Sequence, residues 1–192
     1  MKDFSFYFGL GWHHIISWNA LDHILFIIAL AAIYTLQEWK KVLILVTAFT
    51  VGHSITLALT VFDIIRFSNE WVEFLIPCTI VITSITNLFQ HRFTNKSLRL
   101  NYYFALFFGL IHGMGFANSI RFILAKDQQI GVSLFAFNIG LEVGQIIVVM
   151  IILSIAYTIF TVIKVNRREW VLFLSSMVLA LALEMTIARI PN

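Results

Sequence analysis

Residues 131–163 read GVSLFAFNIGLEVGQIIVVMIILSIAYTIFTVI, an apolar run in which Glu142 is the one charged residue. A run of about 18 or more apolar residues with few charges is typical of a transmembrane helix. The rest of the chain has the same character: 60% of its 192 residues are hydrophobic, 12% are charged, and its mean hydropathy is +0.90. Soluble domains carry about 25% charged residues. The composition therefore predicts an all-α integral membrane protein.

About six apolar segments predict a polytopic transmembrane helix bundle, which we treat as a single integral membrane domain over residues 1–192. They are about Leu21–Thr35, Val42–Phe62, Trp71–Phe89, Tyr102–Leu124, Gly131–Ile163 and Trp170–Ile187. The fifth is longer than a bilayer needs, so we expect it to tilt or to begin with a non-spanning piece around Gly131–Phe137. Before the first, the aromatic residues of Phe4–Trp18 predict an interfacial or re-entrant segment.

The charge and cysteine content exclude several classes of function. The net charge of +3 comes from basic residues in short loops, so it does not indicate a nucleic-acid partner. A single cysteine, Cys78, excludes an internal disulfide and any multi-thiolate metal site. The spans leave no room for a soluble catalytic domain, so the partner of most of the surface is the lipid bilayer.

The distribution of lysine and arginine predicts the orientation. Cytoplasmic loops carry an excess of these residues, and an outside N-terminus gives the larger number to the inner loops. The inner group is Lys40, Lys41, Arg92, Lys96, Arg99, Lys164, Arg167 and Arg168, and the outer group is Lys2, Arg66, Arg121, Lys126 and Arg189. We therefore expect both termini on the outer side.

Ionisable residues inside or at the mouth of the apolar segments mark a candidate site. Such groups are costly in a bilayer and usually face a bundle interior or a water-filled cavity. They are His14, Asp22, His23, His53, His112 and Glu142. With an outside N-terminus, the second and fourth spans bring His53 and His112 to a similar depth. The fifth span brings Glu142 into the same layer, in the outer half of the bilayer.

Spacing along the spans supports a shared polar surface. Asn138, Glu142 and Gln145 are four and three residues apart, which places them on one helical face. Ser54 lies beside His53 and adds a hydroxyl to the same surface. Glycines at Gly109/Gly113 and Gly140/Gly144 form small-xxx-small pairs, which let helix backbones approach closely in lipid.

Neutral imidazole and carboxylate groups are good ligands for Ni²⁺, Co²⁺, Zn²⁺ or Fe²⁺. Asp22 is able to ligate an ion directly or to hold an imidazole N–H from outside the ligand shell. Both roles stay open. Asp22 and His23 point about 100° apart on a helix, so both face one ion only if the helix start is frayed.

Four ordered blocks of the sequence resemble the HupE/UreJ family of small membrane proteins associated with hydrogenase and urease systems. They are His14-Ile15 followed by Leu21–Phe26, then Thr47–Ala58, Phe108–Ala117 and Phe137–Gln145. The resemblance covers roughly residues 11–150. It implies a nickel or cobalt permease, or an accessory protein for nickel uptake, in a bacterial inner (plasma) membrane. It also implies that the metal-handling residues are His14, Asp22, His23, His53, His112 and Glu142.

Two positions depart from the family pattern. Thr86-Asn87 stands where the family tends to carry a Glu-Asn pair, and Ala20 stands where relatives often have glycine. The first change removes one acidic group from the inner half of the third span.

Three hypotheses follow from these residues. In the first, a divalent ion enters from the outer side, binds the histidine and carboxylate layer and passes inward. In the second, the chain is an intramembrane zinc hydrolase acting on a lipid or membrane-embedded substrate. Asp22, Ser54 and the histidines would then hold Zn²⁺, and Glu142 would act as general base. The third is a structural or assembly partner, and a homo-oligomer remains an open alternative.

Overall fold

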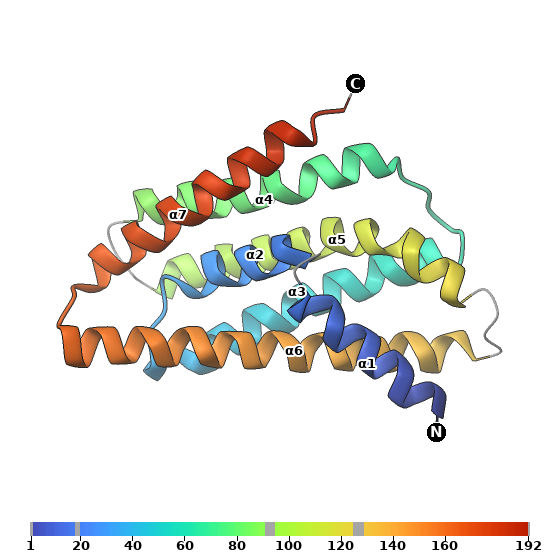
Figure 1. The fold of residues 1–192 in the computed structure, drawn as a ribbon, viewed down its shortest axis with the longest axis horizontal. Helices are drawn as coiled ribbons and strands as arrows, with labels where there is room; N and C mark the ends of the chain where they lie inside the picture. The colour runs from blue at the N-terminus through green and yellow to red at the C-terminus, as the bar shows by residue number, and fades with distance from the viewer. Residues whose placement is uncertain (1, 18–19, 91–94, 125–128, 192) are drawn as a thin grey trace.

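The computed structural model describes residues 2–17, 20–90, 95–124 and 129–191, and every regular element within these ranges is a helix (Figure 1). In chain order the elements are α1 (Lys2–Ile16), α2 (Leu21–Ala31), the 3₁₀ turn η2 (Leu36–Glu38), α3 (Trp39–Val61), α4 (Asn69–Phe89), α5 (Asn95–Leu124), α6 (Ile130–Thr158), the π turn η3 (Ile159–Ile163) and α7 (Arg167–Ala188). The prediction of an all-α bundle is confirmed.

Within the described ranges, four helical stretches are long and apolar enough to cross a membrane. They are Leu36–Val61, Asn69–Phe89, Ile130–Ile163 and Arg167–Ala188. The predicted fifth segment is thus one continuous helix that ends in the π turn, without a separate piece at its start. The predicted fourth segment lies within α5. The chain runs back and forth along the long axis, and both termini lie toward the same end (Figure 1).

The first span differs from the sequence expectation. Only Leu21–Ala31 is helical there, and 11 residues reach about 16 Å at about 1.5 Å per residue, whereas the hydrocarbon core is about 30 Å thick. The preceding segment forms α1, and Phe4–Ile16 and α2 are bent by 68° at the break between them. Together they satisfy the length and composition of a fifth crossing, as a broken span or a re-entrant pair.

Glycines set the closest helix contacts, as the sequence predicts. A Cβ atom added at Gly52 would strike the carbonyl oxygen of Leu106, and one at Gly109 would strike that of Phe49, so the backbones of α3 and α5 touch. The same holds between α1 and α6, where Gly140 faces the carbonyl oxygen of Phe8. These contacts bring α3 close to α5, and α1 close to α6, so that polar side chains of the paired helices can meet.

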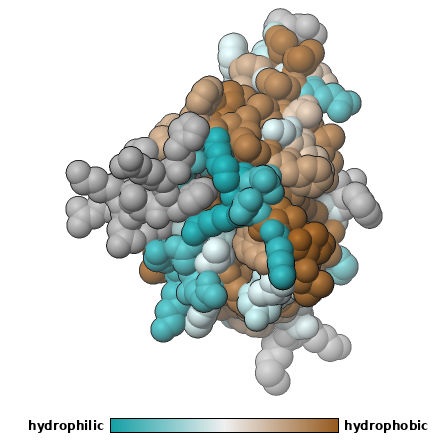
Figure 2. Space-filling model, turned by 90° about the vertical axis from the view of Figure 1, so that its left-hand side faces the viewer, coloured by the Kyte–Doolittle hydropathy of each residue, from teal (hydrophilic) through white to brown (hydrophobic). Residues whose placement is uncertain are grey.

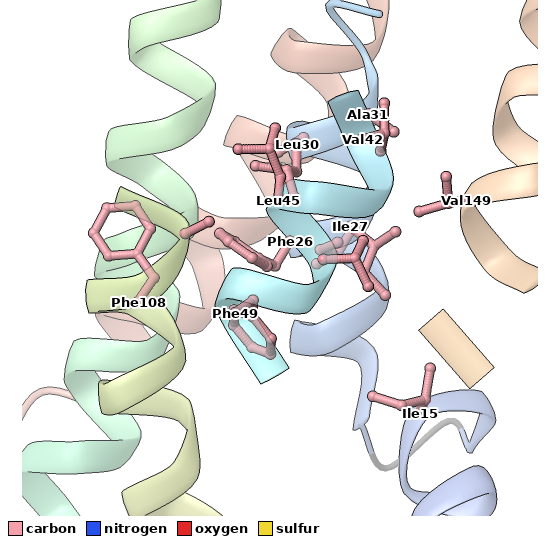
Figure 3. Close-up of a cluster of buried hydrophobic side chains, with 14 of the residues drawn as sticks. Ile15, Phe26, Ile27, Leu30, Ala31, Val42, Leu45, Phe49, Phe108 and Val149 are labelled. Atoms are coloured by element: carbon pink, nitrogen blue, oxygen red, sulfur yellow. The ribbon is translucent and has the colours of Figure 1, made fainter. Parts of the chain in front are cut away.

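Polar side chains gather at the end of the bundle opposite the termini (Figure 2). Glu38 pairs there with Lys41 at 2.9 Å and with Arg167 at 2.6 Å. Arg168 donates to the last carbonyl oxygens of α4, including Gln90 at 3.0 Å. These contacts tie the start of α7 to η2 and to the end of α4. The middle of the bundle, by contrast, holds apolar side chains from several helices, among them Phe26, Ile27 and Leu30 of α2 (Figure 3).

Candidate metal centre

Four histidines from four different helices meet near the break between α1 and α2. His14 comes from the last turn of α1, His23 from the first turn of α2, His53 from α3 and His112 from α5. His53 and His112 have no exposed surface, and His23 is 4% exposed. The bend of 68° between α1 and α2 places His14 and His23, on consecutive helices, with their ring centroids 4.6 Å apart.

Distances within the cluster approach those of a metal site. One ligand nitrogen from each of His14, His23 and His53 lies within 4.8 Å of the other two. Two ligands of one tetrahedral ion, bound at about 2.0–2.1 Å, would be about 3.3 Å apart. Small side-chain rotations would therefore close the triad around an ion. The His112 ring lies next to this triad, with its centroid 5.0 Å from that of His23.

The cluster contains buried ring nitrogens without hydrogen-bond partners among the described residues. They are Nε2 of His14, Nε2 of His23, both ring nitrogens of His53 and Nδ1 of His112. Buried polar groups are almost always paired, and an unpaired one costs about 1–3 kcal/mol. Several unpaired nitrogens at one place thus fit a cation that accepts their lone pairs. Asn138 of α6 lies beside His53 and is positioned to bond one ring nitrogen of His53 through its otherwise unpaired Oδ1, which leaves the other ring nitrogen to offer a lone pair.

Asp22 fixes the tautomer of His23. Its Oδ1 accepts hydrogen bonds from the backbone nitrogen of His23 at 2.9 Å and from His23 Nδ1 at 3.0 Å. Because a carboxylate accepts, the proton sits on Nδ1 and the lone pair is left on Nε2, the unpaired atom. The other carboxylate oxygen lies 3.5 Å from Nη1 of Arg189. This hydrogen bond is compatible with the second of the two roles that the sequence left open for Asp22, that of holding an imidazole N–H.

Thr79 does the same for His112. Its hydroxyl donates to the carbonyl oxygen of Ile76 at 2.6 Å, and His112 Nε2 lies 3.2 Å from the same hydroxyl oxygen. Since the one hydroxyl proton is used, His112 Nε2–H is the donor in that contact. The lone pair of His112 is therefore on Nδ1. Thr79 stands in a row with Thr83 and Thr86 along α4, which is a weak signal in the sequence because such hydroxyls usually bond their own helix.

Glu142 is not brought into the histidine cluster. It is half-buried, and its Oε1 accepts a hydrogen bond of 2.7 Å from the exposed Thr47. Gln145, on the same face, is buried and accepts from Thr50 at 2.9 Å. Ser54 donates to the carbonyl oxygen of Thr50 at 2.7 Å, so its proton is used within its own helix. Asn138, Glu142 and Gln145 thus form a polar face on α6, but of these three residues Asn138 alone lies beside the histidine cluster.

A cavity lies beside the cluster, and its lining extends to Arg189, which follows the last residue of α7. Its volume is about 250 Å³. Its polar lining is His14, Asp22, His23, Glu73, His112 and Arg189. A second cavity of about 360 Å³ also reaches His14, and its lining includes the exposed His13 together with Leu10 and Phe116. Glu73 and Arg189 were not singled out as site residues, because residues near helix ends give no periodic signal for a shared cavity.

This arrangement could hold a borderline divalent ion. Its donors are imidazole nitrogens, with a carboxylate as outer partner, and such sets suit Ni²⁺, Co²⁺ and Zn²⁺. A family model described as HupE / UreJ protein matches residues 1–189. Among curated proteins and among solved structures, the comparisons find no match.

Proposed function

This chain belongs to the HupE/UreJ family, which is associated with nickel and cobalt uptake, and from that premise we propose that it moves a divalent transition-metal ion across the membrane. The proposed ligands are His14, His23, His53 and His112. The ion is the cargo, and nickel or cobalt is favoured over zinc by the family. A role as an accessory protein in uptake uses the same site.

The observation that carries this proposal is the set of unpaired nitrogens contributed by four helices to one buried point. A structural histidine in a membrane helix usually bonds a neighbouring helix, whereas no such partner is found among the described residues for Nε2 of His14, Nε2 of His23 or Nδ1 of His112. Asp22 and Thr79 hold the opposite nitrogens of His23 and His112. They are proposed as positioning residues, because outer partners that fix tautomers commonly change metal affinity about 10–100-fold.

The cavity and the charge distribution support entry from the outer side. The 250 Å³ cavity has Glu73, an exposed acid, on its wall, and it lies toward the end that holds both termini. At the opposite end the described residues include Lys40, Lys41, Lys164, Arg167 and Arg168, and the positive-inside tendency favours a cytoplasmic position for that end. We therefore propose an inner-membrane protein with its N-terminus outside.

Metal binding by purified protein tests the proposal. Wild type, His53→Ala and His13→Ala would be titrated with Ni²⁺ and Co²⁺ by calorimetry, and nickel accumulation would be measured in cells expressing each. His13 is the matched control, because it is adjacent to His14 but lies outside the triad. We expect His53→Ala to lose binding and uptake and His13→Ala to retain both. Equal binding by the wild type and His53→Ala would overturn the proposed site.

An intramembrane zinc hydrolase is the second candidate, favoured by the second cavity. That cavity is lined mainly by apolar surface and reaches His14, so it would admit an apolar chain. The general base expected for this reaction, Glu142, is bound to Thr47 and is not among the cluster residues. Transport therefore has the stronger support. Retention of Zn²⁺ through exhaustive dialysis, with no exchange for Ni²⁺, would reverse this order.

A further inference from the structure

On the side of the cluster away from the 250 Å³ cavity, three phenylalanines form a continuous layer. Phe26 of α2 lies 4.9 Å from Phe49 of α3 and 6.0 Å from Phe108 of α5, measured between ring centroids. Figure 3 shows these rings beside one another within the buried core. Phe26 and Phe49 also pack on His112, at 5.4 and 5.1 Å. The metal centre thus rests directly on this phenylalanine layer.

Beyond the layer lies a third, much smaller cavity. Phe26 and Phe108 form part of its wall, and its polar lining is Thr83, Thr86, Asn87 and Asn101. Its volume is about 20 Å³. A cavity of about 10–15 Å³ is enough to hold one water. It therefore has room for one water or one dehydrated ion, but not for an ion with its hydration shell.

The polar groups of this inner cavity offer oxygen atoms. Asn87 uses its Nδ2 to donate to the carbonyl oxygen of Ala29 at 2.7 Å, which leaves its amide oxygen as the group that can contact an ion. Thr83 and Thr86 donate to carbonyl oxygens of their own helix, at 2.8 Å each, so their hydroxyl oxygens remain acceptors. The inner cavity thus offers weaker, harder ligands than the imidazoles above it.

We propose that Phe26 is the inner gate of the metal path, closed in this conformation, and that the small cavity beneath it is an exit station for the partly dehydrated ion. This inference rests on the proposed transport function. Hydrophobic constrictions close ion paths by excluding water. Phe26 packs on His112 and also lines the inner cavity, so it lies between the two proposed ion positions.

The position of α2 makes such a gate movable. The helix has 11 residues, it follows the bend after α1, and its C-terminal end leads into the 3₁₀ turn η2. The bond from Asn87 to Ala29 ties it to α4 at the level of the inner cavity. A small shift of α2 would move His23 and Phe26 together, because both belong to this helix. Release of the ion by His23 and opening of the path would then be one event.

Ni²⁺ entry into proteoliposomes tests the gate. Full-length wild type, Phe26→Ala, Phe26→Leu and Ile27→Ala would be reconstituted with a fluorescent chelator trapped inside, and Ni²⁺ binding to each would be measured by calorimetry. Ile27 is the matched control, since it is equally buried on the same helix, at 1% exposure. It lies on the side of Val149, away from the phenylalanine layer (Figure 3).

We expect Phe26→Ala to admit Ni²⁺ roughly tenfold faster than wild type, because the water-excluding ring is gone. Phe26→Leu should be intermediate, and it replaces Phe26→Ala as the deciding variant if that protein does not fold. Ile27→Ala should match the wild type. Intact Ni²⁺ binding without faster entry in the Phe26 variants would overturn the gate alone. Absence of Ni²⁺ binding by the wild type would overturn the proposed function, and the gate with it.

Discussion

Replacing Thr79 by valine keeps the shape of the side chain and removes the oxygen that accepts from His112 Nε2 at 3.2 Å. Two effects follow. The buried Nε2–H loses its acceptor, which costs about 1–3 kcal/mol of folding free energy. The proton is also free to move to Nδ1, which then has no lone pair to offer a metal ion. Loss of an outer partner of this kind weakens metal binding about 10–100-fold, which corresponds to about 1.4–2.8 kcal/mol.

The assay is calorimetric titration of Ni²⁺ into detergent-purified protein, with thermal unfolding measured in parallel. Thr60→Val is the matched control, because Thr60 is also buried and donates to a carbonyl oxygen of its own helix, that of Thr56, but lines none of the cavities described above. We expect Thr79→Val to bind Ni²⁺ at least about tenfold more weakly than Thr60→Val. Equal affinities for the two variants would refute the reasoning that Thr79 sets the tautomer of His112.

Three further outcomes are expected. Glu142→Gln should leave Ni²⁺ affinity unchanged, because the acid is held outside the cluster; a large loss in calorimetry would return it to the ligand set. Arg189→Gln should speed Ni²⁺ association, measured by stopped flow, since it removes a positive charge from the cavity that leads to Asp22; an effect that does not shrink with added salt would count against this cause. Gly140→Ala should lower the thermal unfolding midpoint, because its Cβ would strike α1, and overpacking costs about 1–3 kcal/mol. Gly131→Ala should leave the unfolding midpoint unchanged, because no atom lies within 4 Å of the added Cβ. Equal midpoints for the two variants would contradict a stabilising role for the close contact between α1 and α6.

Much of the bundle could be predicted because lipid permits few alternatives. Long apolar runs must be helices there, so α3, α4, α6 and α7 begin and end within a few residues of the expected segments. The short α2 was overestimated because apolarity continues past its last turn through Ala32 and Ile33, where the chain is no longer helical. The break before it depends on how α1 packs against α6, which no local pattern records.

The similar depth of His53 and His112 could be expected from the sequence, because the position of a residue along a span of known orientation gives its depth in the bilayer. Their contact also needed Gly52 and Gly109 to bring α3 and α5 together. Glu142 shows the limit of this reasoning. Periodicity places Glu142 and Gln145 on the same helical face. Glu142 is nevertheless half-buried and bonds Thr47, whereas Gln145 is buried and bonds Thr50, a difference that depends on how α3 packs against α6.

X-ray absorption spectroscopy of the Ni²⁺-loaded protein tests the central claim most directly. The signal of imidazole rings bound to nickel is distinct from that of water or carboxylate ligands. The account predicts rings from His14, His23, His53 and His112 bound to the nickel, and their loss in the variant that replaces all four by alanine. A first shell made only of oxygen atoms, or one unchanged in that variant, would contradict it.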